Sequence, residues 1–136
     1  MSKYQERISE IERWLRFRKE EGFVIAKAKG YTYLVNGKKT NAKIAKARRR
    51  DGSFWSSISR KQLDDMDVFV WLIQKAENYY AIPNKKMKEY ATSWLSPTYD
   101  RFYFRLDNTN HEYIAHTRHN ISDYYQNRLT SHSPFS

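Results

Sequence analysis

Six consecutive apolar residues, Val68 to Ile73, constrain the fold more than any other stretch of the chain. Successive side chains of a strand point to opposite faces, so a strand that is apolar throughout has to be buried on both sides. Such a strand belongs inside a sheet that is covered by further layers, as in α/β proteins. The run is far too short to cross a bilayer, so we expect no membrane partner. The pattern predicts a mixed α/β domain, a sheet flanked by helices.

Local patterns predict the other elements. Helical spacing of apolar residues, capping-box pairs and apolar–polar alternation identify them. In chain order they are a helix over 2–21, strands over 23–28, 31–35, 39–49 and 53–58, a short helix from Ser59, the central strand over 68–73, a strand over 79–82, a helix from Asn84, a strand over 101–106 and helical turns over 121–129. We expect one domain over residues 1–129 and a loose tail over 130–136.

The segment from Phe23 to Ile58 carries most of the positive charge. Asn36-Gly37 and Asp51-Gly52 are hairpin signals, because these residues tolerate positive φ, and they fold the segment into a β-meander. Its only acidic residue is Asp51. Its nine basic residues are Lys27, Lys29, Lys38, Lys39, Lys43, Lys46, Arg48, Arg49 and Arg50.

The charge balance indicates a nucleic-acid partner. The formal net charge is +10 and the pI is about 9.8, a range typical of nucleic-acid-binding domains. Residues 1–68 carry a net charge of +8 and residues 69–136 only +2, an asymmetry that favours a binding surface over general solubility. The absence of cysteine excludes disulfides and thiolate metal sites. With no apolar signal segment at the N-terminus, we expect an intracellular, cytoplasmic protein of a cell, or a viral product within one.

Basic and aromatic residues of the meander form the predicted binding site. Lysine and arginine neutralise phosphates, and exposed aromatic rings stack on bases. By strand alternation we expect Tyr31, Tyr33 and Tyr103 to be the exposed rings. The predicted binding residues of the meander are Lys38, Lys39, Lys43, Lys46, Arg48, Arg49, Arg50, Tyr31 and Tyr33.

The order of elements resembles that of the PD-(D/E)XK, or restriction-endonuclease-like, nuclease superfamily over about residues 4–90. A first helix leads into a strand and a hairpin, and the long second hairpin strand resembles the family's motif-bearing strand. The string over 44–55 is similar to strings that follow the family's catalytic lysine. Residues 59–70 fit the helix and buried strand that come next, and Tyr80-Ala-Ile-Pro83 matches a common exit. The resemblance implies a restriction-endonuclease-like core.

In that family, an acid on the first hairpin strand and an acid two residues before a lysine on the next strand hold a divalent metal, which activates water. Lys46 matches the lysine, but Ile44 occupies the position of the second acid. No Asp or Glu occurs anywhere in residues 22–50. Mg²⁺ needs carboxylate oxygens, so this pattern predicts that the metal site is lost and that no cofactor is bound.

Three functions stay open at this point. The leading one is nucleic-acid binding, to DNA, on a nuclease-like fold without its metal site. An active Mg²⁺-dependent endonuclease of the restriction or homing type, a phosphodiesterase, would use Lys46 with Glu10 and Asp51 as catalytic residues. A small basic phage-type inhibitor would instead dock on a host nucleoprotein. A protein partner or a homodimer also remains open.

Histidines offer a further alternative. His116 and His119 are three residues apart, and His111 precedes them, so zinc binding or metal-free phosphodiester chemistry is conceivable. The ordinary interpretation is that these are polar surface side chains, and no cysteine supports a zinc site. We expect no metal ligands here.

Overall fold

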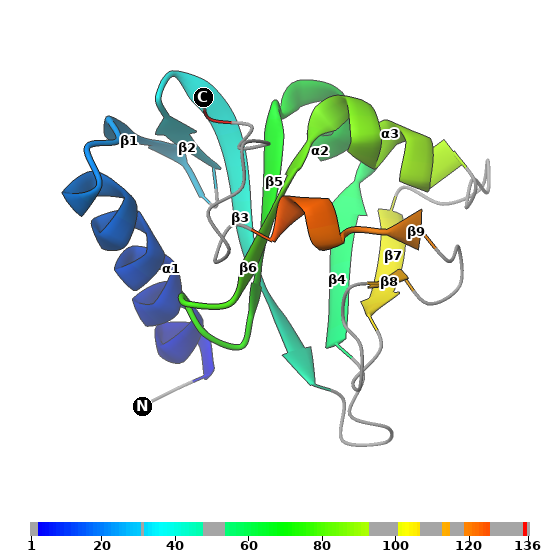
Figure 1. Cartoon of the computed structure of the whole chain (residues 1–136), viewed down its shortest axis with the longest axis horizontal. Coiled ribbons are helices and arrows are strands. Elements are labelled where there is room, and N and C mark those ends of the chain that lie inside the picture. The colour runs from blue at the N-terminus through cyan, green and yellow to red at the C-terminus, as the bar shows by residue number, and fades with distance from the viewer. Residues whose placement is uncertain are drawn as a thin grey trace.

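The computed structural model describes residues 3–30, 32–47, 54–92, 101–106, 113–114, 119–125 and 135. Its elements are α1 (Lys3–Glu20), β1 (Ile25–Lys29), β2 (Thr32–Val35), β3 (Lys38–Ala47), β4 (Phe54–Ser59), α2 (Arg60–Asp65), β5 (Val68–Ile73), β6 (Tyr79–Pro83), α3 (Asn84–Thr92), β7 (Arg101–Leu106), β8 (Tyr113–Ile114), β9 (His119–Asn120) and the 3₁₀ turn η1 (Ser122–Tyr124). The mixed α/β class expected from the sequence is confirmed (Figure 1).

Five strands form a mixed sheet in the order β1-β2-β3-β5-β6. β3 and β5 run parallel, with Thr40 opposite Val68, and the remaining neighbours are antiparallel. At its C-terminal end β3 also pairs with β4, through Lys46 and Ala47. β4 then pairs with β7, and β8 and β9 complete this second ribbon (Figure 1). β3 is therefore shared by the two groups of strands.

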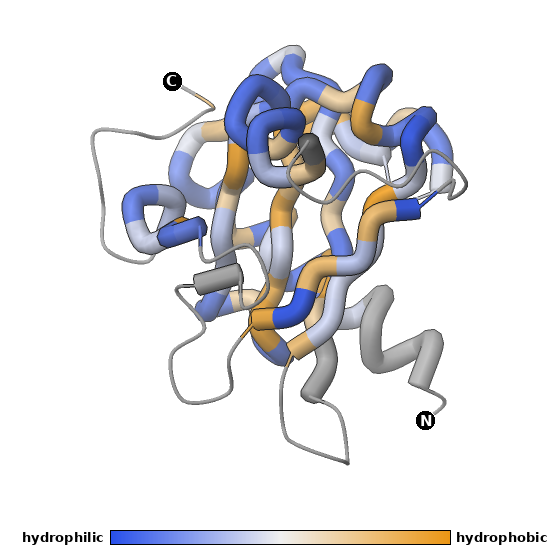
Figure 2. The backbone as a smooth tube through the Cα atoms, turned by 90° about the vertical axis from the view of Figure 1, so that its right-hand side faces the viewer, coloured by the Kyte–Doolittle hydropathy of each residue, from blue (hydrophilic) through white to orange (hydrophobic). Residues whose placement is uncertain are grey.

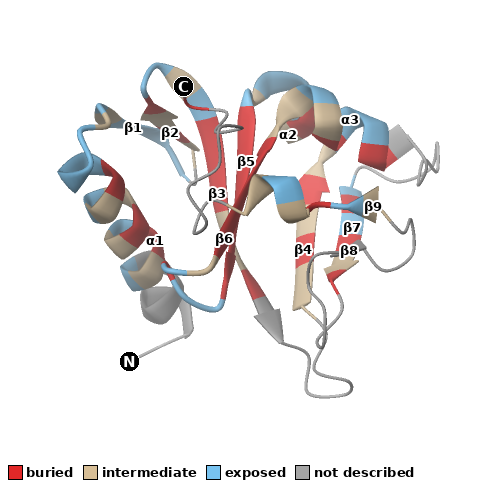
Figure 3. Ribbon diagram, in the orientation of Figure 1, coloured by how far each residue is buried: buried red, intermediate tan, exposed pale blue. Residues whose placement is uncertain are grey.

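Two apolar clusters pack on opposite faces of the five-stranded sheet. β5 supplies Phe69, Trp71 and Ile73 to the first cluster, which is closed by the β4–β7 ribbon, α2 and α3. The intervening Val68, Val70 and Leu72 join the second cluster, beneath α1. All six side chains are buried, which confirms a strand covered on both faces (Figure 3). Figure 2 shows hydrophobic residues along the extended strands, alternating in places with hydrophilic ones.

Side chains of α1 fix this helix to the sheet. Ile11 and Trp14 are buried in the second cluster. Arg18, which is itself buried, donates a hydrogen bond from Nη1 to the hydroxyl of Tyr79. Burial raises the pKa of the Tyr79 hydroxyl to about 12, although the nearby Arg18 charge acts in the opposite direction. The helix thus packs on the sheet through Ile11 and Trp14, while Glu12, Arg16 and Lys19 are exposed.

Two local signals read from the sequence are confirmed. Asn36 and Gly37 have φ values of 51° and 78°, which is the left-handed backbone that a type I′ hairpin turn requires. Ser59 caps α2, since its hydroxyl accepts from the backbone N–H of Gln62 while the Gln62 side chain accepts from the backbone N–H of Ser59. The turn predicted at Asp51-Gly52 lies outside the described residues.

The helical turns predicted over 121–129 can be checked only as far as Tyr125, because residues 126–129 lie outside the described residues. Up to Tyr125 the structure shows β9 followed by the short turn η1. Ile121 is buried in the first cluster, whereas Tyr125 makes a bridge to Tyr80 of β6 and donates to Asn78 Oδ1 at 2.8 Å. At Ile121 and Tyr125 the apolar spacing therefore reflects two separate tertiary contacts.

Phe135 is the one residue of the predicted loose tail that the structure describes. Its side chain is 4% exposed, and its ring lies 6.1 Å from Trp14 and 5.9 Å from Phe23 between centroids. Its carbonyl also accepts a hydrogen bond from Asn36 Nδ2. At this residue the tail is anchored to the second cluster, because an aromatic ring gains by leaving water.

None of the helices within the described ranges has the length and apolar character needed to cross a membrane.

Candidate nucleic-acid interface

The basic residues of β3 lie in different environments. Lys39 is exposed and Lys38 is half-buried at the start of the strand. Lys46 is placed only by its backbone, opposite Trp55 of β4. Arg48, Arg49, Arg50, Asp51 and Tyr31 lie outside the described residues. The predicted binding and catalytic roles of these residues stay predictions.

Lys43 is the unusual member of this group, because its ammonium is turned inward. Nζ donates to the carbonyl of Ser57 at 2.6 Å and to Gln62 Oε1 at 3.1 Å. No carboxylate of the described residues forms an ion pair with it. Its pKa is lowered to about 8, first by burial and then by the positive charge of Arg101. Lys43 therefore links β3 to β4 and α2, and a phosphate would have to compete with these contacts.

Tyr33 does not lie where alternation suggested. Its side chain is only 5% exposed and belongs to the second cluster, beneath α1. The expectation of an exposed ring is therefore wrong for Tyr33, since a buried ring offers no face to a base. Tyr103, by contrast, is 47% exposed, as expected.

Glu10, the candidate catalytic acid on α1, has structural partners. Its carboxylate accepts two hydrogen bonds from Arg13 Nη1, both at 2.8 Å, and one from the backbone N–H of Ala76 at 2.9 Å. Arg13 in turn pairs with Glu77. The carboxylate thus ties α1 to the connection between β5 and β6. These contacts account for Glu10 without a catalytic role.

A second lysine of β3 has the spacing that the nuclease resemblance requires. Lys43 stands two residues after Asn41 on the same face of β3, and Thr32 of β2 is the direct cross-strand partner of Asn41. Asn41 is 2% exposed, and its Nδ2 finds no acceptor within the described part of the chain. Neither Thr32 nor Asn41 is acidic, so this pair of strands brings no carboxylate to Lys43. The sequence analysis did not consider Asn41 and Lys43 together, because it aligned the family motif on Lys46. The two-residue spacing of Asn41 and Lys43 was nevertheless visible in the sequence.

The described residues contain no group of three or more His, Asp or Glu side chains that could hold a metal ion. His119 is half-buried, with its ring 4.6 Å from that of Tyr90 between centroids. His111 and His116 lie outside the described residues.

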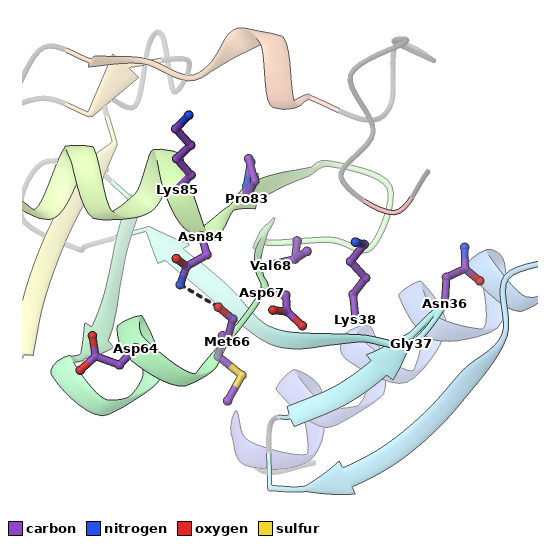
Figure 4. Close-up of a pocket in the computed structure, with 10 residues that line it drawn as sticks. All are labelled: Asn36, Gly37, Lys38, Asp64, Met66, Asp67, Val68, Pro83, Asn84 and Lys85. Atoms are coloured by element: carbon purple, nitrogen blue, oxygen red, sulfur yellow. Dashed lines mark hydrogen bonds between the residues drawn. The ribbon is translucent and has the colours of Figure 1, made fainter.

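A polar hollow lies beside the start of β3 (Figure 4). Asp67 Oδ2 accepts from the backbone N–H of Lys39, and Asn84 Nδ2 donates to the carbonyls of Leu63 and Met66. The carboxylates of Asp64 and Asp67 point in different directions (Figure 4). Except for Asp64, the polar groups named here join α2, β3, β5 and α3, so the hollow is a structural junction.

The outer face of the β4–β7 ribbon collects the exposed aromatic and cationic side chains. On β7, Phe102, Phe104 and Leu106 are buried in the first cluster, so the alternate residues face outward. These are Arg101, Tyr103 and Arg105. Directly opposite them on β4 lie Ser59, Ser57 and Trp55. The clean alternation of 101–106 is the sequence signal for this face, which the predicted site did not include.

Comparisons of the chain with models of protein families, with curated proteins and with solved structures found no match.

Proposed function

We propose that this chain binds nucleic acid, with DNA as the expected partner, on a nuclease-like fold that has lost its metal site. The observation that carries the proposal is the state of the lysines in β1 and β3. No ion pair within the described residues involves any of the five whose side chains are placed. They are Lys27, Lys29, Lys38, Lys39 and Lys43. Cations without internal counter-charges attract a polyanion, and such contacts dominate affinity for nucleic acid.

The order of elements supports the nuclease-like part of the proposal. A helix, a strand, a hairpin, a further strand, a short helix and a doubly buried strand follow one another, and this order resembles that of the superfamily. The two β3 registers supply no acid, since Ile44 precedes Lys46 and Asn41 precedes Lys43 at the required spacing. Ile44 packs against the second cluster. A fold of this kind without carboxylates keeps its basic surface but lacks the ligands for Mg²⁺.

The proposal is tested by the salt dependence of binding, measured by fluorescence anisotropy on a labelled duplex between 50 and 200 mM salt. If the protein contacts four phosphates, raising the salt over this range should weaken binding about 150-fold. The double variant Lys38→Gln/Lys39→Gln should reduce the slope of log Kd against log salt by roughly two. Lys19→Gln/Lys75→Gln, exposed lysines on α1 and after β5, is the control with the same charge change. Affinity that is indifferent to salt would overturn nucleic-acid binding.

The lost metal site is tested separately. Plasmid DNA incubated with the protein and Mg²⁺ or Mn²⁺ should remain intact, and the melting temperature should not respond to either ion. Metal-dependent cutting that disappears in Lys46→Ala would establish the endonuclease instead.

A further inference from the structure

The outer face of the β4–β7 ribbon presents a ring between two guanidinium groups. Tyr103 is flanked on β7 by Arg101 and Arg105, each two residues away on the same face. With a rise of about 3.3 Å per residue, the two arginines are rooted roughly 13 Å apart along the strand. This face is therefore a line of cation, ring and cation.

Tyr103 is unusual among the described aromatic residues because it stays in water. The only large hydrophobic side chains that are exposed within the described ranges are Val24, at 72%, and Tyr103, at 47%. Across the ribbon, Ser57 is its direct partner and Trp55 stands diagonally opposite. Diagonal neighbours lie roughly 7–8 Å apart, within reach of aromatic side chains. A planar group stacked on Tyr103 would therefore also lie near the half-buried Trp55.

Cations border this face at the end nearest α2. Arg101 Nη1 donates weakly to Ser57 Oγ at 3.4 Å, while Lys43 Nζ donates to the carbonyl of the same serine. Arg60 and Lys61 line a shallow hollow with Arg101, although Asp64 and Asp65 share its rim. Arg101 and Lys43 thus converge on Ser57 with no ion-pair partner within the described residues. An anion placed here would relieve their mutual repulsion.

We propose that this face, formed by Trp55, Arg101, Tyr103 and Arg105, binds single-stranded nucleic acid, with a base stacked on Tyr103 and phosphates held by the arginines. The inference rests on the proposed function and names the strand type and the surface. An exposed ring contributes only when a base is unpaired, because in a duplex the π-faces are already stacked. The arginines supply backbone contacts without sequence preference.

The test compares a labelled dT₁₂ strand, a U₁₂ strand and a 12-base-pair duplex, each titrated with the full chain. Tyr103→Ala should weaken binding of the single strands by roughly 5- to 150-fold, the range that stacking of one base covers, and should leave duplex binding unchanged. Tyr103→Phe keeps the ring and should retain affinity. Val24→Ala, which removes the other exposed apolar side chain, is the matched control and should behave as wild type. The ratio of the dT₁₂ and U₁₂ affinities identifies DNA or RNA as the preferred strand.

Ultraviolet cross-linking to dT₁₂ provides a second readout that needs no variant. A cross-linked peptide that contains Tyr103 or Trp55 supports the proposal, and a cross-link confined to other peptides overturns it. If Tyr103→Ala and Arg101→Gln/Arg105→Gln bind every probe normally while Lys38→Gln/Lys39→Gln binds weakly, the inference fails and the proposed function stands. If wild type binds none of the three probes at 50 mM salt, both fail.

Discussion

The charge pattern of the sequence predicts that Lys43 binds phosphate. In the structure this half-buried lysine instead joins β3 to β4 and α2 through hydrogen bonds. Alternation along β3 places Asn41, Lys43 and Ala45 on one face of the strand, but it does not tell which face of the sheet is covered. That α2 covers this face did not follow, because the capping box of α2 is local whereas its docking on β3 is tertiary. The same limit explains Tyr33, whose ring was expected to be exposed although α1 covers the face on which it lies.

The half-buried amine of Lys43 predicts a specific pH dependence of stability. Lysine in an unfolded chain titrates near 10.4, whereas folded Lys43 titrates at about 8. Between these values the unfolded state binds more protons, so the free energy of unfolding should rise with pH. Relative to Lys43→Met, wild type should gain about 1–2 kcal/mol between pH 7 and pH 9.5, measured by urea unfolding. Lys39→Met, at an exposed position, is the control, and its difference from wild type in the free energy of unfolding should not change over this pH range. If the difference between wild type and Lys43→Met is also independent of pH, the lowered pKa is contradicted.

Glu10 predicts a loss of stability rather than of activity. Glu10→Gln removes the charge that accepts from Arg13 and Ala76, and should lower the free energy of unfolding by about 1–2 kcal/mol. Glu12→Gln, exposed on the same helix, should have little effect. Binding of nucleic acid should be unaffected in both variants. If Glu10→Gln is as stable as wild type but loses an ability of wild type to cut DNA, Glu10 is a catalytic residue after all.

At the scale of elements, α2 depends on a side chain with two partners. Gln62 Oε1 accepts from the backbone of Ser59 at 3.0 Å and from Lys43 Nζ at 3.1 Å. Gln62→Met should therefore destabilise the protein by about 1–3 kcal/mol, because it leaves the half-buried Lys43 ammonium with one acceptor fewer. In the double variant Gln62→Met/Lys43→Met, the loss in free energy of unfolding should differ from the sum of the two single losses by at least about 0.5 kcal/mol. Lys61→Met, the exposed neighbour, should be additive with Lys43→Met, and additivity for both pairs would contradict the link.

Strands and turns were predicted well where the signal is local. Alternation identified β7, the continuous apolar run identified β5, and Asn36-Gly37 identified its hairpin. The short strands β8 and β9 were missed, because each is held by one or two cross-strand pairs rather than by a pattern of its own. The candidate face on β7 was missed for another reason: charge counting favoured the basic meander, and alternation alone cannot tell which sheet a strand joins.

At the scale of the whole molecule, the C-terminus closes the second cluster. Phe135 packs on Trp14 and Phe23, from the first helix and the segment before β1. A chain ending at residue 134 should therefore be less stable than one ending at residue 135, by about 3–5 kcal/mol, the usual cost of removing a buried aromatic ring. Equal urea midpoints for the two chains would show that the ring contributes nothing in solution.

Strand β3 pairs with three other strands, and this limits which sequence changes the chain can accept. Its side chains alternate between the layer under α1 and the layer under the β4–β7 ribbon, and its edges set the register of β2, β5 and β4. An inserted or deleted residue between Thr40 and Ala45 would exchange the two faces and shift the pairings together. Relatives of this chain should therefore differ along β3 by substitution alone, and length differences should gather in the connections between elements.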